Sequence, residues 1–110
     1  MALNKNNRLK KLSDFQGVFK KGKAIGANFL FIKIKRNNLS VNRFGLTVSA
    51  KIIKTAVGRN KVKRALSETI RFDLSLMKGG YDVVIGLRRP GSIPELKEDL
   101  LKSLKKSEII

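Results

Sequence analysis

The segment from Arg59 to Arg71 holds the densest group of side chains that could contact a charged ligand. On a helical wheel of 100° per residue with Val62 at zero, a polar stripe falls between roughly 100° and 200°. The stripe consists of Asn60, Lys63, Arg64, Ser67 and Arg71, and no acidic residue interrupts it. Arg offers a planar fork of donors to a phosphate, Lys a point charge and Asn a two-sided hydrogen bond. The stripe therefore predicts contact with the phosphates of RNA or DNA.

Two other interpretations of this stripe are less favoured. A solvated helix face usually mixes signs, because Glu and Lys at i, i+4 stabilise it, whereas uncompensated cations repel one another. A surface for anionic lipid would need a large aromatic or leucine face for insertion, and none lies opposite the stripe. Nucleic acid remains the favoured partner.

Aromatic residues give a second, weaker signal. Phe15 and Phe19 stand four residues apart in a predicted short helix, a spacing typical of core positions. In the first predicted strand, Phe31, Lys33 and Lys35 share one face, and two lysines are unusual in a packed interior. Phe offers stacking surface for unpaired bases, and Lys follows the backbone of a single strand. The pattern leaves open whether these residues fill the core or line a groove for single-stranded nucleic acid.

Residues for protein-based catalysis are scarce. The chain has no His and no Cys, so the usual general base and the usual soft nucleophile are missing. The closest group of acids, Glu95, Glu98 and Asp99, lies in one helical segment, where solvent exposure explains it. We therefore expect no catalytic residue and assign no metal site in the protein itself.

Charge and length indicate a single domain that binds a polyanion. The 110 residues include 25 Lys and Arg against 8 Asp and Glu, giving a formal charge of +17, and 42% are hydrophobic. Residues 1–71 hold 18 basic and 2 acidic side chains, whereas residues 72–110 hold 7 and 6. Length and hydrophobic content predict one folded domain over 1–110, with 1–12 as a flexible basic arm. The excess charge in the first part requires an anionic partner.

The sequence also bears on localisation. The lack of cysteine fits a reducing compartment, and no apolar stretch is long enough to span a bilayer. The first residues, MALNKNNRLKK, have no apolar core of the kind a secretory signal needs. We expect a soluble cytoplasmic protein.

The elements that must position these residues follow from periodicity and capping. Thr55 is a plausible cap for the long helix, and Ser92 with Glu95 forms a predicted capping box. The predicted elements are a helix over 14–20 capped by Ser13 and stopped near Gly22, strands over 28–36 and 43–49, a helix from 55 to about 76, a strand over 81–87 buried on both faces, and a last helix from 93. Whether a short extra strand lies around Leu39 to Val41 stays open. The order α-β-β(-β)-α-β-α indicates an α+β domain with one central sheet packed with helices.

Three segments, taken in chain order, resemble the protein component of bacterial ribonuclease P. They are RLKKLSDFQGVFKKGK (8–23), RFGLTVSAKIIKTAVGRNKVKRALSETIR (43–71) and GYDVVIGLRRPG (80–91). The second carries the most specific pattern, a strand ending in Gly-Leu-x-Val-Ser, then a Lys, then Ala-Val-x-Arg-Asn-x-Val-Lys-Arg on a helix. The resemblance spans nearly the whole chain at matching spacing.

The resemblance implies a fold and a function. The family fold is a central mixed sheet whose long helix is entered by a left-handed crossover, contrary to the usual right-handed rule. The family's RNA subunit performs the metal-dependent removal of the 5′ leader of precursor tRNA, with Mg²⁺ bound mainly by that RNA. The implied partners are ribonuclease P RNA and the 5′ leader, with no membrane and no small-molecule substrate.

The resemblance also assigns roles to residues. Arg59, Asn60, Lys61, Lys63 and Arg64 match the family's basic motif, and Phe15 and Phe19 match aromatics of the leader cleft. The full set of candidate RNA-binding residues is Arg59, Asn60, Lys61, Lys63, Arg64, Arg71, Arg8, Lys10, Lys11 and Lys51, and that of the leader cleft is Phe15, Phe19, Phe31 and Lys33.

The chain departs from the family pattern at three of its positions. Lys61 stands where Arg is common, which keeps the charge but loses the bidentate fork. Lys33 stands where Tyr is frequent, and Ser67 where a basic residue is common. The alternative function is that of a ribosomal or other structural RNA-binding protein. The compact basic motif beside a Phe-bearing helix disfavours this alternative.

Overall fold

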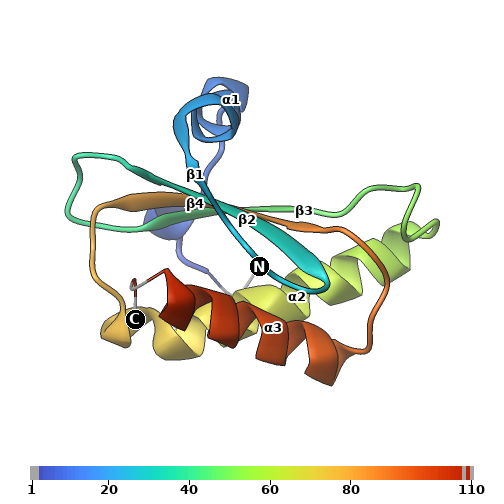
Figure 1. The fold of residues 1–110 in the computed structure, drawn as a ribbon. Helices are drawn as coiled ribbons and strands as arrows, with labels where there is room; N and C mark the ends of the chain where they lie inside the picture. Colours follow the sequence, from blue (N-terminus) through green and yellow to red (C-terminus); the bar gives the residue numbers. More distant parts are fainter. Residues whose placement is uncertain (1–2, 108, 110) are drawn as a thin grey trace.

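A four-stranded mixed sheet divides the molecule into two unequal layers (Figure 1). The computed structural model describes residues 3–107 and 109. The strands, in their spatial order, are β1 (Lys23–Ile25), β2 (Leu30–Arg36), β4 (Tyr81–Leu87) and β3 (Arg43–Thr47). The helices are α1 (Leu12–Lys21), α2 (Ala56–Asp73) and α3 (Ile93–Lys106), with short 3₁₀ turns η1 (Lys5–Asn7) and η2 (Leu74–Leu76). The α+β class and the element order are confirmed for the described residues.

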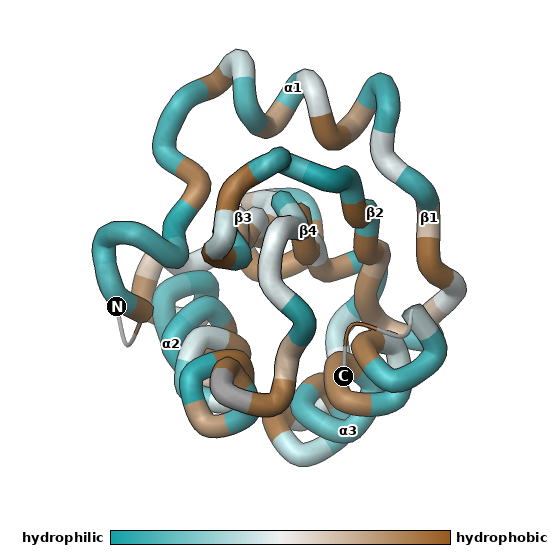
Figure 2. Tube along the Cα trace, turned by 90° about the vertical axis from the view of Figure 1, so that its left-hand side faces the viewer, coloured by the Kyte–Doolittle hydropathy of each residue, from teal (hydrophilic) through white to brown (hydrophobic). Residues whose placement is uncertain are grey.

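The two faces of the sheet carry different side chains because residues alternate along each strand. Leu30 and Ile32 of β2 and Val83 and Ile85 of β4 are buried in the main core together with the inner faces of α2 and α3. The opposite face of the same strands meets α1, where Val84 packs in a small second cluster. Figure 2 shows α1 alone on one side of the sheet and α2 with α3 on the other.

The connection from β3 to β4 has the unusual hand that the resemblance implies. The two strands are parallel neighbours, with Phe44 opposite Val83, and α2 lies between them in the chain. Both strands run from left to right in Figure 1 above α2, and β4 lies nearer the viewer than β3, as Figure 2 confirms. This arrangement is a left-handed crossover, contrary to the usual rule for parallel strands.

The N-termini of two helices are capped as their sequences predict. The Thr55 hydroxyl accepts a hydrogen bond from the Gly58 N–H at 3.1 Å and caps α2. Ser92 and Glu95 form the reciprocal capping box that opens α3. The predicted cap of α1 is wrong, because that helix begins at Leu12 after Lys11, and Ser13 lies within its first turn.

The sheet has one strand more than the three that the sequence predicts, but this strand does not lie at Leu39 to Val41, where the sequence pattern leaves an extra strand open. Leu39 to Val41 form bends, since Asn38 has a φ of 60° and the Asn37 side chain accepts a hydrogen bond from the Leu39 N–H. The additional strand is β1, which follows α1 directly and pairs antiparallel with β2.

The predicted basic arm makes contacts with the domain. Leu3 and Leu9 are buried, and the Leu9 N–H donates to the Phe44 carbonyl at 2.9 Å, beside a bridge between Arg8 and Phe44. Residues 3–11 are thus attached along the outer edge of β3, while the flexibility of residues 1–12 stays a prediction. Among the described residues, no helix combines the length and apolarity needed to cross a membrane.

Candidate RNA-binding surface

The outer side of α2 presents the predicted cations at the edge of the sheet. Val62, Leu66 and Ile70 are buried beneath it, while Arg64 and Arg71 are exposed. A hollow of about 320 Å³ is lined by Leu46 of β3 together with Asn60, Lys63 and Arg64. Three of the predicted RNA-binding residues therefore converge on one hollow that has no acidic residue in its described lining.

Ser67 does not belong to the exposed stripe. It is fully buried, and its hydroxyl donates a hydrogen bond to the Lys63 carbonyl at 2.8 Å. The wheel placed Ser67 between Lys63 and Arg71, but burial depends on neighbouring segments that a single helix does not contain. The exposed stripe is thus narrower than predicted.

Arg59 has a structural task in addition to its predicted contact with RNA. Its guanidinium donates to the carbonyls of Ile53 at 3.0 Å and Lys54 at 2.9 Å, so it ties the loop before α2 to the first turn. Lys61 and Lys51 are exposed and lie outside the residues that line the α2 hollow. The structure thus separates Arg59, Lys61 and Lys51 from the group formed by Asn60, Lys63 and Arg64.

The predicted cations of the N-terminal segment gather in a second hollow. Arg8, Lys10 and Lys11 line a space of about 340 Å³ together with Lys5, Asn6, Asp14, Leu39, Val41 and Arg43. Arg8 Nε is buried and has no hydrogen-bond partner in the described part of the chain. This hollow also contains apolar surface that the sequence pattern does not predict, since Leu39 and Val41 are 48% and 38% exposed.

Arg43 is the cation of this hollow with the strongest internal partners. It donates two hydrogen bonds to Asp82, at 2.8 and 2.7 Å, and lies 3.6 Å from Asp14. The hydrogen bond to Asp82 raises the pKa of Arg43, with both carboxylates adding to the effect. Arg43 therefore holds β3, β4 and α1 together, and its charge is already compensated.

The aromatic residues form a cluster between α1 and the sheet. Phe15 packs on Gly45 and Phe31 packs on Gly86, so closely that a Cβ at either glycine would overlap the ring. Both rings are partly buried beside the fully buried Val18. These phenylalanines thus combine core contacts with a remaining accessible surface.

Phe19 and Lys33 lie at the accessible side of this cluster. Phe19 is 40% exposed, and its ring centroid lies 6.1 Å from that of Phe31. Lys33 Nζ donates to the Phe19 carbonyl at 2.8 Å and lies 5.7 Å from the ring centroid. The four predicted cleft residues are therefore gathered on one face of the sheet, although Lys33 uses one of its donors on α1.

The cluster and the α2 hollow meet at β3. Gly45 supports Phe15 on one face of the sheet, and its neighbour Leu46 lines the α2 hollow on the other. Successive residues of a strand point to opposite faces, so the two sites lie back to back across the same edge strand. A nucleic acid contacting both would pass around β3.

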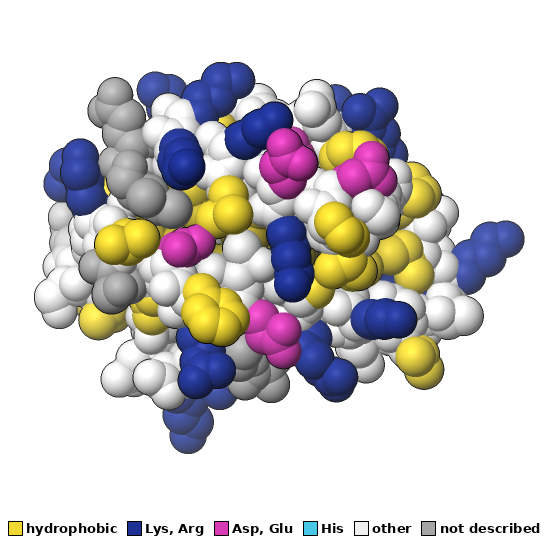
Figure 3. All heavy atoms as spheres, turned by 90° about the horizontal axis from the view of Figure 1, so that it is seen from below, with side chains coloured by type: hydrophobic (Ala, Val, Ile, Leu, Met, Phe, Trp, Pro, Cys, Tyr) yellow, Lys and Arg dark blue, Asp and Glu magenta, His cyan; other side chains and the backbone are white. Residues whose placement is uncertain are grey.

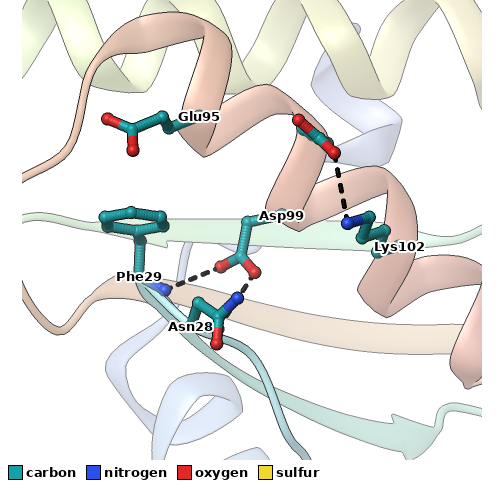
Figure 4. Close-up of a pocket in the computed structure, with 6 residues that line it drawn as sticks. Asn28, Phe29, Glu95, Asp99 and Lys102 are labelled. Atoms are coloured by element: carbon teal, nitrogen blue, oxygen red, sulfur yellow. Dashed lines mark hydrogen bonds and ion pairs between the residues drawn. The ribbon is translucent and has the colours of Figure 1, made fainter.

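The acids in α3 stabilise the protein itself. Asp99 is buried, and its carboxylate accepts hydrogen bonds of 2.9, 2.9 and 3.0 Å from the backbone N–H groups of Asn28, Phe29 and Leu30. Glu98 pairs with Lys102 at 3.1 Å beside a hollow of about 150 Å³ (Figure 4). Solvent exposure, the expected explanation for these acids, is therefore wrong for Asp99. In the part of the chain that the structure describes, no three potential ligands of the His, Cys, Asp or Glu type are grouped for a metal ion.

The face covered by α2 and α3 has a mixed character. Figure 3 shows basic, acidic and apolar side chains interspersed over it. Acids lie among the cations there, as on an ordinary solvated face. The acid-free α2 hollow differs from it and is the strongest candidate for phosphate contact.

Comparison with known proteins assigns the family. A family model described as Ribonuclease P matches residues 3–108. The ribonuclease P protein components of Alkaliphilus oremlandii (strain OhILAs) and Caldanaerobacter subterraneus subsp. tengcongensis are 38% and 42% identical, covering 94% and 96% of this chain and 93% and 92% of those proteins.

Solved structures agree with this assignment. The RNase P protein of Thermotoga maritima has a TM-score of 0.80 at 28% identity, covering 90% of this chain and 96% of that chain. A Staphylococcus aureus RNase P protein mutant with defective mRNA degradation activity has a TM-score of 0.89 at 28% identity, covering 96% and 92%. With its matching strand order and its family model covering nearly every residue, the chain belongs to the ribonuclease P protein component family.

Proposed function

We propose that this protein binds ribonuclease P RNA and the 5′ leader of precursor tRNA, and so assists the RNA-catalysed removal of the leader. The supporting observation is the back-to-back arrangement at β3, with cations on one face and aromatic rings on the other. Lys63 and Arg64 offer donors to the phosphates of the structured RNA subunit. Phe19 offers a ring on which an unpaired base of the leader stacks.

In this proposal the chemistry belongs to the RNA. The carboxylates of α3 are used by a buried hydrogen-bond network, a helix cap and an ion pair, which leaves them unsuited to hold a catalytic metal. Mg²⁺ would be bound mainly by the RNA subunit and would supply the activation of a water nucleophile there. The protein's cations reduce the repulsion between the phosphates of the substrate and those of the catalytic RNA.

The family assignment decides against a ribosomal protein as the alternative. It leaves mRNA degradation to be separated from leader removal by experiment, because one Staphylococcus aureus relative is described as a mutant with defective mRNA degradation activity. Every assay of this protein therefore needs an arm without the RNA subunit.

A salt titration tests the binding surface. With about five to eight phosphate contacts, the slope of log K against log salt for the RNA subunit should be near −4 to −6. Lys63→Gln with Arg64→Gln should flatten that slope by about 2, whereas Lys78→Gln with Lys97→Gln, which removes the same charge elsewhere, should leave it unchanged. A slope shallower than about −2 for the unmodified protein would show that its basic surface is not the binding surface.

A further inference from the structure

A third cationic hollow lies at the other edge of the sheet. The strand pairing places Lys23 opposite Ile34 and Arg36 opposite Tyr81, so these four side chains share the face on which α3 packs. Because α3 ends at Lys106, the corner of the sheet beyond it is left open. The hollow measures about 340 Å³ and is lined by Lys23, Ile25, Ile34, Arg36, Tyr81, Lys106 and Ser107.

The described lining of this hollow has three cations and no acid. Lys23, Arg36 and Lys106 take part in none of the ion pairs of the described residues, which involve Arg43 and Lys102 instead. Arg36 lies over the ring of Tyr81 at 5.5 Å from its centroid. A guanidinium stacked in this way keeps its in-plane donors available for a phosphate.

The other hollows along α3 have a different character. The space of Figure 4 is lined by Glu95, Glu98 and Asp99, and the neighbouring space also contains Asp99. Both spaces thus have a carboxylate in their lining, and Lys102, which lines both, is paired with Glu98, whereas Lys106 lines the second space and the hollow at the β1 edge. In having cations and no acid among its described lining residues, the hollow at the β1 edge resembles the α2 hollow, from which it is separated by the width of the sheet.

We propose that the hollow at the β1 edge binds one nucleotide of single-stranded RNA, as a contact separate from α2 and from the aromatic cluster. Arg36, Lys23 and Lys106 would hold the phosphate, while the ribose and base lie on Ile25 and Ile34. The volume is in the range of small-molecule sites, which suits a single nucleotide. A lipid surface is disfavoured, because none of the exposed large apolar residues lines this hollow.

Tyr81 makes this proposal directly testable. It is the only tyrosine of the chain, so protein labelled with 3-fluorotyrosine gives one ¹⁹F resonance, located in the hollow. Titration of the full-length protein with tetrauridylate should shift this resonance in a saturable manner. The shift should persist in the Lys63→Gln, Arg64→Gln variant, since that variant changes only the distant α2 hollow.

Two further variants complete the test. Lys23→Gln with Lys106→Gln should weaken the interaction and lower the salt slope by about 0.7 to 1.4, for one or two lost phosphate contacts on a single strand. Lys54→Gln with Lys97→Gln removes the same charge outside the hollow and should change neither quantity. Equal losses in both variants would overturn the proposal, as would an unmoved resonance or a shift that inorganic phosphate reproduces at the same concentration. Loss of the shift with the α2 variant alone would assign the contact to α2.

Discussion

Two glycines set the position of the aromatic cluster at the residue scale. Gly45 and Gly86 lie within strands, where a glycine contributes no side chain to packing. Here their bare backbone lets the rings of Phe15 and Phe31 lie directly on the sheet. The accessible surface near Phe19 therefore depends on residues that make no contact with RNA in the proposed function.

Gly86→Ala tests this support. The added methyl would overlap the Phe31 ring, so the ring must move, and we expect a loss of about 1–3 kcal/mol in unfolding free energy. Gly17→Ala is the matched control, because its Cβ would meet only Lys35 Nζ at 3.7 Å within a helix that favours alanine. Urea unfolding of both variants checks this. Equal stability of the Gly86 variant and the unmodified protein would contradict the close packing.

Phe15 and Phe19 should behave differently when truncated. Phe19→Ala should cost little stability because the ring is 40% exposed, and should weaken leader binding by about 1–3 kcal/mol through the lost stack. Phe15→Ala should cost about 3 kcal/mol of unfolding free energy, because its ring packs on Gly45. Thermal melts beside leader-binding titrations separate the two effects. Unchanged leader affinity of folded Phe19→Ala protein would remove Phe19 from the cleft.

At the scale of elements, one buried carboxylate adds hydrogen bonds to the apolar packing of α3 on the sheet. Asp99 accepts the N–H groups of three consecutive residues at the start of β2, which would otherwise lack partners. Asp99→Ala should therefore cost about 3 kcal/mol or more, since it leaves buried donors unpaired. Glu98→Ala is the control, because its pair with Lys102 is exposed and contributes at most about 1 kcal/mol. A cost for Asp99→Ala as small as that of Glu98→Ala in urea unfolding would contradict this anchoring role.

The start of α3 should make a pH-dependent contribution to stability. The Ser92 N–H donates to Glu95, and this hydrogen bond lowers the pKa of Glu95 below its ordinary value. A lowered carboxylate pKa stabilises the folded state above the unfolded pKa of about 4.3 and loses that effect as the pH falls through the folded value.

Glu95→Gln should remove this pH-dependent contribution. The difference in melting temperature between it and the unmodified protein should be constant from pH 6 to 8 and shrink below about pH 4. Ser92→Ala should cost about 1 kcal/mol at neutral pH through the lost cap. A difference between Glu95→Gln and the unmodified protein that grows as the pH falls would contradict the sign of the pKa shift.

The elements differ in how far their sequences predict them. The apolar run from Val83 to Leu87 is sufficient to predict β4, and the caps at Thr55 and Ser92 act locally. β1 has three residues and no visible periodicity, since its strand conformation depends on pairing with β2. The crossover hand came only from the resemblance, because periodicity carries no information on the direction in which a helix returns.

The residues of the candidate site also differ in how far the sequence predicts them. The helical wheel predicts that Lys63 and Arg64 are accessible, because a helix face is a local property. It fails for Ser67, which other segments bury, and for the hollow of Leu39 and Val41, which residues far apart in the chain create. Contacts between distant segments lie beyond what a single-sequence pattern contains.

At the scale of the whole molecule, cationic hollows lie at both edges of the sheet. The α2 hollow and the aromatic cluster share the β3 edge, which allows one region to contact the catalytic RNA while a neighbouring region contacts the leader. On the face seen in Figure 3, acids lie among the cations, in contrast to the described linings of these two hollows. This arrangement is the one that the proposed function requires, in which the protein brings two RNAs together and the RNA subunit performs the cleavage.

Single-turnover cleavage of precursor tRNA across a Mg²⁺ series tests this central claim most directly. With a bacterial ribonuclease P RNA, the protein should lower the Mg²⁺ concentration required, because its cations offset phosphate repulsion. Lys63→Gln with Arg64→Gln should lose most of that assistance, and Lys78→Gln with Lys97→Gln should retain it, while the RNA alone still cuts at high Mg²⁺. Carefully purified protein without RNA should remove no leader at any Mg²⁺ concentration. Leader removal by the protein alone, or full assistance from the α2 variant, would contradict the account.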